Sequence, residues 1–286
     1  MFIVQHRKLF YAVSGLLVAA SLAALLIWGL NLGIDFEGGS ILEISYAESR
    51  LEKAAVEETL APLGVSASVR PTGEKGYIIR MRDVTEGERQ SVSEALSGAT
   101  VERFNSVGPI LGREAAGKSI LSISLVILAI ILFIAFAFRK VSEPVSSWKY
   151  GVLAIVALIH DILVPPGVFA VLGRFAGVEV DTLFVTALLV ILGFSVHDTI
   201  VVFDRVRENL RISREARDRK DFAAIVGESI QQTFVRSINT SLTTVLALLV
   251  LYFAGPEVTK HFSLALLIGI IAGTYVPGYD YFDAET

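Results

Sequence analysis

The sequence predicts a multi-pass α-helical membrane protein with six transmembrane helices. A small α+β ferredoxin-like extracytoplasmic domain is expected between helices one and two. The 286-residue chain is 53% hydrophobic and has a mean hydropathy of +0.62, an average that few soluble domains of this length reach. Its apolar residues form runs of membrane-spanning or nearly membrane-spanning length, and one long polar segment separates the first run from the second.

The first apolar run covers residues 9–30 and carries no charge. Residues 21–23 are similar to a signal-peptidase site, so a cleaved signal peptide is the alternative interpretation. The apolar residues continue to Leu30, however, beyond the usual core of a signal peptide. We therefore expect residues 1–30 to hold the N-terminus and a retained first helix.

Residues 31–118 form the polar segment, and its patterns alternate between strand and helix periods. Thr85 with Glu88 three residues later indicates a capping box at the start of the second helix. The resulting order, β-α-β-β-α-β, is the ferredoxin-like arrangement. The expected strands cover 40–47, 65–70, 77–84 and 100–107, and the expected helices cover 48–64 and 85–98.

Residues 119–275 hold the remaining spans. We expect them at about 119–138, 150–172, 182–203 and 237–254, with a sixth beginning at His261. A basic loop is expected at about 204–236. The sixth run ends before the roughly 17 residues that a crossing needs, so this helix is expected to be cut short. Residues 276–286 are treated as an atypical tail without a function.

Basic residues gather on one side of the expected spans. Two precede the first span, and many lie in the loop at 204–236, whereas the opposite short loops hold only Arg174 and Lys260. The positive-inside rule then places the N-terminus and the basic loop in the cytoplasm. The domain at 31–118 is expected on the outer side.

Composition and spacing argue against several classes of protein. The chain has no cysteine, which excludes disulfides and thiolate metal sites, and its net charge of −4 gives no indication of a nucleic-acid partner. Ser195, His197 and Asp198 are the residue types of a catalytic triad. On a helix, however, His197 lies about 100° from Asp198 and about 200° from Ser195, so it cannot bridge them. We predict no enzymatic activity, cofactor or metal.

Asp198 is the first candidate functional residue, because it lies inside the fourth span in the stretch "GFSVHDTIVVFDRVREN". A carboxylate at the bilayer centre costs about 2.5–3.5 kcal/mol, so it normally faces a helix bundle and marks a pathway or relay. The alternative is that Asp198 caps local polar groups near the headgroups. Ser195 and His197 are its neighbours, with a role in the pathway or in packing.

The fifth span carries a polar stripe at three- and four-residue spacing. From the cytoplasmic end, Thr240 and Thr243 reach about the depth of Asp198, and the long side chain of Arg236 can extend toward it. We predict a proton relay of Asp198, Arg236, Thr240 and Thr243. The alternative is that the hydroxyl groups only hold helices together. The stripe consists of Arg236, Asn239, Thr240, Thr243 and Thr244.

The third span places His160 and Asp161 near mid-membrane. Pro165 and Pro166 follow and are expected to kink the helix and to leave backbone carbonyl groups without donors. The His-Asp pair could line a path or form a structural hydrogen bond, and the sequence leaves both interpretations open.

The stretch "GIDFEGGS" lies between the first span and the first strand. Its glycines, Gly33, Gly38 and Gly39, allow tight turns and close backbone contacts around Asp35 and Phe36. It lacks the glycine spacing and the terminal Lys of a phosphate-binding loop.

These motifs together resemble one family. The chain, from about Phe10 to Tyr275, is similar to the SecF branch of the SecD/SecF family of protein-export membrane proteins, within the resistance-nodulation-division (RND) superfamily. The similarity rests on "GIDFEGGS", "ALIHDILV", "GFSVHDTIVVFDRVREN", "SINTSLTT" and "FSLALLIGIIAGTY".

The resemblance implies a function in protein transport by the Sec pathway of the bacterial cytoplasmic (inner) membrane. Such a subunit acts with SecD beside the SecYEG channel and uses the proton motive force for late steps of preprotein translocation. YajC and YidC are candidate further partners. In the family, an Asp of the fourth helix and an Arg at the start of the fifth are associated with proton movement. By position these are Asp198 and Arg236.

Two other functions remain open from the sequence. One is a small-molecule or lipid exporter of the same superfamily, against which the small outer domain argues. The other is a non-conducting scaffold of the export complex. The sequence also leaves open whether H⁺ or Na⁺ is the coupling ion.

Overall fold

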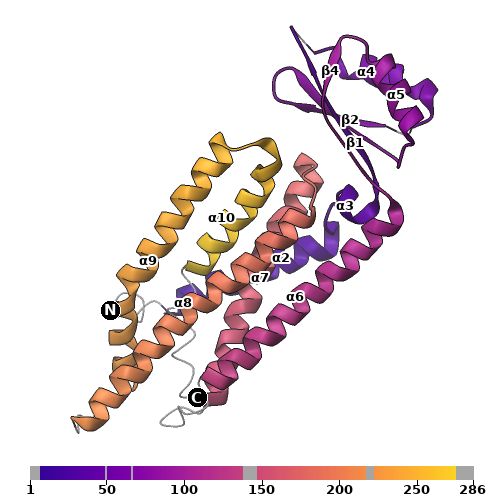
Figure 1. Ribbon diagram of the computed structural model, residues 1–286. Helices are drawn as coiled ribbons and strands as arrows, with labels where there is room; N and C mark the ends of the chain where they lie inside the picture. The colour runs from indigo at the N-terminus through magenta and orange to yellow at the C-terminus, as the bar shows by residue number, and fades with distance from the viewer. Residues whose placement is uncertain (1–6, 49, 66, 138–146, 217–221, 275–286) are drawn as a thin grey trace. The chain divides into compact units, whose positions relative to one another are not determined.

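The computed structural model describes residues 7–48, 50–65, 67–137, 147–216 and 222–274 (Figure 1). It divides into two compact units, of which one comprises Met1–Asn31 and Leu121–Thr286 and the other Leu32–Ile120. In the described residues, six helices are long and apolar enough to cross a membrane. The predicted class, a six-helix membrane protein with a small α+β domain, is confirmed.

The helices α6, α7, α8 and α9 are longer than the sequence predicts, whereas α2 has the predicted length. The fifteen residues of the last helix, with the turn before it, give a candidate span of 18 residues, Glu257–Thr274, so the sixth span reaches crossing length. The atypical tail at 276–286 lies outside the described residues. The helices are α2 (Arg7–Trp28), α6 (Pro109–Ala137), α7 (Ser147–Ala176), α8 (Thr182–Glu215), α9 (Phe222–Ala254), the short η2 (Glu257–Thr259) and α10 (Lys260–Thr274).

The basic loop expected at 204–236 is largely helical, which corrects the sequence prediction. α8 continues to Glu215 and α9 begins at Phe222. Charged residues three or four positions apart pair along this part of α8, such as Arg205 with Glu208 at 2.6 Å and Arg211 with Glu215 at 3.8 Å. Such pairs stabilise a helix that leaves the apolar layer.

α7 runs through Pro165 and Pro166 as one continuous helix. Each proline lacks the N–H that a helix donates four residues back, so the carbonyl groups of Asp161 and Ile162 have no helical donor. The expected loss of backbone hydrogen bonds therefore falls at the polar pair of this helix, without ending it.

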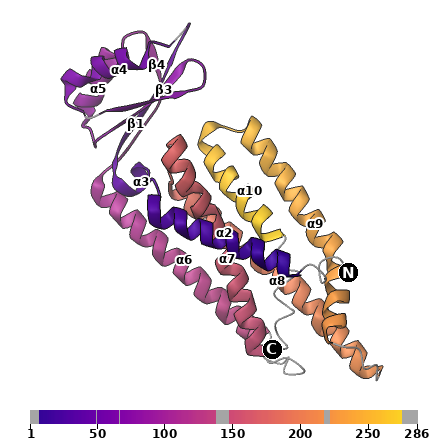
Figure 2. The same cartoon turned by 180° about the vertical axis from the view of Figure 1, so that it is seen from behind.

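Within the first unit, α10 packs against α7, α8 and α9, and α2 packs against α7 (Figure 2). Gly167 of α7 permits the contact with α2, because a Cβ at this position would overlap Ser21. Close approach at small residues is the usual way in which helices associate in a membrane. The helices α7, α8 and α10 thus form the interior where buried polar groups can meet.

The second unit has the predicted β-α-β-β-α-β order. The four strands form one antiparallel sheet in the order β2-β3-β1-β4 (Figure 1). A short helix within "GIDFEGGS" was not predicted. The elements are α3 (Ile34–Glu37), β1 (Gly39–Tyr46), α4 (Lys53–Leu60), η1 (Ala61–Leu63), β2 (Ser68–Thr72), β3 (Gly76–Met81), α5 (Glu86–Ala95) and β4 (Ala99–Val107).

The core of this unit lies between the sheet and its two longer helices. Alternate residues of β1, such as Leu42 and Ile44, point to one face and pack with Val56 of α4 and Val92 of α5, and all four are at most 1% exposed. The predicted capping box is present at Thr85 and Glu88.

Candidate functional site

Asp198 lies on the buried face of α8. It is 4% exposed, and Ser195 and Thr199 are also buried, as expected for residues three and one positions away on an inward-facing stripe. His197 is exposed. The structure therefore places Asp198 toward the bundle interior and His197 away from it. No residue in the described part of the chain hydrogen-bonds to the Asp198 carboxyl group.

His160 and Asp161 form a second buried polar group on α7. They are 4% and 2% exposed, and His160 Nδ1 lies 2.9 Å from Asp161 Oδ1. The other carboxyl oxygen points at α10, where a Cβ built on Gly273 would lie 3.0 Å from Asp161 Oδ2. The Asp161 carboxyl group is therefore enclosed by its own helix and by the glycine surface of α10.

The two buried carboxyl groups lie on α7 and α8, which pack against each other through Leu158, Leu192 and Val196. No Lys or Arg among the described residues lies within ion-pair distance of either carboxyl group. Two carboxylates in an apolar interior without a cation are costly to ionise together, so this arrangement is suited to binding a proton.

The predicted stripe of α9 is mostly on the surface of this chain. Arg236, Asn239 and Thr243 are exposed, and Thr240 is half-buried. The hydroxyl groups of Thr240 and Thr243 donate to carbonyl oxygens of their own helix, at 2.9 Å each. The structure does not bring this stripe into hydrogen-bond contact with Asp198.

Ser241 is a buried polar residue of α9 beside the stripe, and the sequence did not single it out. It is 4% exposed, and its hydroxyl group has no hydrogen-bond partner among the described residues. Ser241 follows Thr240 directly, so helical spacing alone places it beside the stripe rather than on it. The sequence signal that could have found it is the four-residue spacing of the hydroxyl residues Ser229, Thr233, Ser237 and Ser241.

Hydrogen bonds at the charged end of α8 and α9 fix the register of the two antiparallel helices. Asn209 donates to Ser229 at 2.8 Å, and Arg205 donates to Gln232. Moving seven residues along α8 from Arg205 reaches Asp198, and the same step along α9 from Gln232 reaches Asn239. This register places Asn239 and Thr240 at the level of Asp198 and Arg236 about one turn nearer the charged end.

In the stretch "GIDFEGGS", two of the three glycines, Gly38 and Gly39, make the close backbone contacts that the sequence predicts. Gly38 and Gly39 have φ angles of 80° and 122°, and a Cβ on Gly38 would lie 2.7 Å from Cα of Pro109 at the start of α6. Gly33 has a φ of −77° and is the N-cap of α3, so its conformation does not require glycine. Phe36 of this helix is buried, whereas Asp35 belongs to its acidic first turn.

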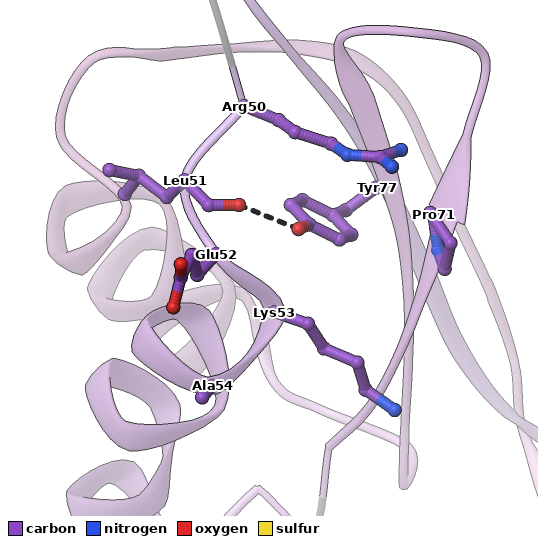
Figure 3. A pocket seen from close by; sticks show the side chains of 7 residues that line it. All are labelled: Arg50, Leu51, Glu52, Lys53, Ala54, Pro71 and Tyr77. Atoms are coloured by element: carbon purple, nitrogen blue, oxygen red, sulfur yellow. Dashed lines mark hydrogen bonds between the residues drawn. The ribbon is translucent and has the colours of Figure 1, made fainter.

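An open cavity of about 500 Å³ lies in the second unit, at the start of α4 (Figure 3). Tyr77 forms its floor and donates a hydrogen bond to the carbonyl oxygen of Leu51 at 2.6 Å. The guanidinium group of Arg50 lies 5.6 Å from the centre of the Tyr77 ring. Lys53 lines the opposite side (Figure 3). The lining groups form a polar surface hollow of the second unit.

The described residues contain no group of three or more His, Cys, Asp or Glu side chains arranged to hold a metal ion. The buried site offers carboxyl, imidazole and hydroxyl groups. These groups bind and release protons or coordinate a small cation through oxygen.

Comparison with known proteins identifies the family. Residues 88–279 match the model described as "Protein export membrane protein SecD/SecF, C-terminal", and residues 24–49 match the "SecD/SecF GG Motif". The protein translocase subunit SecF of Thermobaculum terrenum is 45% identical over 290 residues, which cover 96% of this chain and 89% of that protein. The SecF subunit of Anaerolinea thermophila is 41% identical, with the same two coverages.

Solved structures of SecDF are similar over nearly the whole chain. The crystal structure of SecDF from Thermus thermophilus matches with a TM-score of 0.85 and 28% identity, covering 100% of this chain and 38% of that one. SecDF in its super-membrane-facing form matches with a TM-score of 0.66 and 30% identity. The chain thus spans less than half of these SecDF chains. From the family models and relatives together, the chain belongs to the SecD/SecF family of protein-export membrane proteins.

Proposed function

We propose that the chain is a SecF-type subunit that works with SecD to couple the proton gradient to late steps of preprotein export. The observation that carries this proposal is the Asp198 carboxyl group, buried in a membrane-spanning helix without a cationic partner among the described residues. Intramembrane carboxyl groups of this kind commonly mark ion pathways.

The energy available from the gradient is sufficient for such a role. One proton crossing the membrane potential gains about 2.3 kcal/mol per 100 mV. That amount biases an equilibrium between two conformations by roughly fifty-fold. Binding of a proton to Asp198 neutralises the buried face of α8, which packs against α7, α9 and α10, and its release restores the charge. The conformational preference of these packed helices then follows the occupancy of the site.

The relay predicted from the sequence also includes Arg236, Thr240 and Thr243. Thr240 lies at the level of Asp198 and is half-buried in this conformation. In the proposal, α9 presents a different face to α8 in a second conformation, which brings Arg236 and the two hydroxyl groups toward the carboxylate. The hydrogen bonds of Asn209 and Arg205 to α9 are the contacts that change in that movement.

The proposed partners are SecD, the SecYEG channel, YajC, YidC and the translocating preprotein. The protein translocase subunit SecDF of Bacillus subtilis supports the first of these, because 95% of this chain matches 36% of that longer protein at 32% identity. In the proposed orientation, the N-terminus and the basic ends of α8 and α9 face the cytoplasm of a bacterial inner membrane. The small α+β domain then faces the outside.

A substitution at Asp198 tests the proposal. We expect Asp198→Asn to abolish the proton-gradient-dependent stimulation of preprotein translocation into inverted vesicles, because the amide cannot carry the proton. Asp204→Asn is the matched control, since Asp204 lies on the same helix with an exposed side chain. Both variants should reach normal expression and SecD binding.

Two outcomes contradict the proposal. Full gradient-dependent stimulation in Asp198→Asn would exclude this carboxyl group as the proton carrier. Equal proton conductance of proteoliposomes that contain wild type or Asp198→Asn, together with SecD, would favour the scaffold function instead.

A further inference from the structure

The His160–Asp161 pair of α7 is a buried ionisable group that the proposed function does not use. Both side chains are more than nine-tenths buried, and the 2.9 Å contact of Nδ1 and Oδ1 fixes the orientation of the imidazole relative to the carboxyl group. An apolar pair would fill the same space without the cost of burying ionisable groups. The pair therefore requires an explanation beyond packing.

The helices packed around Asp161 contribute few polar groups. α7 contributes His160, and α10 contributes the bare backbone at Gly273. α8 packs against α7 and carries the buried Asp198, and α2 packs on α7 with Ser21 at Gly167. The described basic residues of α7 and α10 lie at the helix ends, outside ion-pair reach of Asp161.

The backbone adds acceptors at the same place. Because Pro165 and Pro166 have no N–H, two carbonyl oxygens of α7 lack helical donors, and one of them belongs to Asp161 itself. Free carbonyl oxygens beside a carboxyl group can hold water or a protonated group by hydrogen bonds. The surroundings of Asp161 are thus suited to reversible protonation of its carboxyl group.

We propose that Asp161, oriented by His160 and seated against Gly273, is a second protonation site of the membrane unit, and that its charge state is coupled to that of Asp198. This proposal rests on the proposed function of Asp198 as a proton carrier. When Asp161 takes up a proton from water, an O–H bond of hydronium breaks as the carboxyl O–H bond forms, and the charge of the site is neutralised. Release to water reverses these changes and restores the charge.

Gly273 is the positioning residue of this arrangement. With a Cβ at 3.0 Å from Oδ2, an alanine would displace the Asp161 carboxyl group by a few tenths of an ångström. The glycine thus lets α10 contact the carboxyl group directly, so the charge state of Asp161 acts on the helix that packs against α7, α8 and α9.

The test is an infrared pH titration of the carboxylic C=O bands of the chain with its SecD partner in proteoliposomes. In the wild type we expect two coupled titration steps that are lost in the Asp161→Asn, Asp198→Asn double variant. In Asp161→Asn one step is lost, and the step of Asp198 moves by about one pH unit or more. Gly273→Ala should move the Asp161 step, whereas Gly193→Ala, which meets no atom within 4 Å, should leave both steps in place.

The outcomes separate this proposal from the proposed function. If Asp161→Asn leaves the Asp198 step and the pH profile of export unchanged, while Asp198→Asn still abolishes stimulation, the second site is excluded and the proposed function stands. If Asp198→Asn retains full stimulation, the proposed function itself fails. Should Asp161→Asn not insert into the membrane, Gly273→Ala decides: an unmoved Asp161 step overturns the proposal.

Discussion

Asp161 and Asp198 are carboxyl groups in helices whose other buried side chains are almost all apolar. Asp198 can be recognised as a candidate functional residue from the sequence alone, because a charged side chain inside a membrane span is costly wherever it lies. The inward face of α9 is harder to predict. The period of 3.6 residues shows that Arg236 and Thr240 lie on the same face of α9. It does not show whether that face contacts the other helices or the lipid, because lipid is as apolar as the bundle interior. The structure buries Ser241 instead.

The capping box of α5 gives a residue-scale prediction for the second unit. Hydrogen bonds from Arg82 and from Thr85 lower the pKa of Glu88 to about 2, from 4.5. The unfolded chain therefore takes up this proton first as the pH falls. The stabilisation by ionised Glu88 is complete above about pH 4.5 and is lost toward about pH 2.

Hydrogen exchange of the α5 amides measures this effect. From about pH 5 to about pH 3, protection beyond the intrinsic pH dependence should fall in the wild type and much less in Glu88→Gln. Glu94→Gln on the same helix is the control and should behave as the wild type. An equal loss of protection in Glu88→Gln and wild type would refute the assignment. Thr85→Ala should cost about 1 kcal/mol of helix stability at neutral pH.

At the scale of elements, propensity and capping predict the second unit well, and the membrane helices less well. The strand patterns and the Thr85–Glu88 box predict the order of its main elements, because each signal is local. α8 extends to Glu215, which a hydropathy rule for spans cannot predict, because its last turns are amphipathic: Val206 and Leu210 are buried while charged residues lie on the exposed side. The short α3 depends on the fit of Gly38 against Pro109, a contact distant in sequence.

The contact of α2 and α7 gives an element-scale prediction. Gly167→Ala places a Cβ onto Ser21, so the helices must separate, at a cost of about 1–3 kcal/mol. Gly15→Ala on α2 is the control, since a Cβ there meets nothing within 4 Å. Thermal unfolding in detergent should show a lower midpoint for Gly167→Ala alone. Equal midpoints for the two variants would show that the helices do not pack as described.

At the scale of the whole molecule, the chain passes twice between its two units, near residues 31 and 120. Within the second unit the two passages are joined by backbone contacts. A Cβ on Gly112 of α6 would lie 2.9 Å from the backbone N of Gly38 and 2.9 Å from the carbonyl oxygen of Phe36. We predict that a change driven by proton binding at Asp198 is transmitted to the second unit through this contact.

Gly112→Ala tests this route. The added Cβ would overlap backbone atoms, which cannot avoid it by rotating as a side chain could. The contact of α6 with α3 should therefore loosen, which lowers the free energy of unfolding by about 1–3 kcal/mol. We expect lower hydrogen-exchange protection at β1 and a several-fold weaker gradient-dependent stimulation of export, while the carboxyl titration of Asp198 stays as in the wild type. Gly117→Ala, on the same helix with nothing within 4 Å, should retain all three properties. Normal stimulation in Gly112→Ala despite a loosened contact would mean that the outer domain responds by another path.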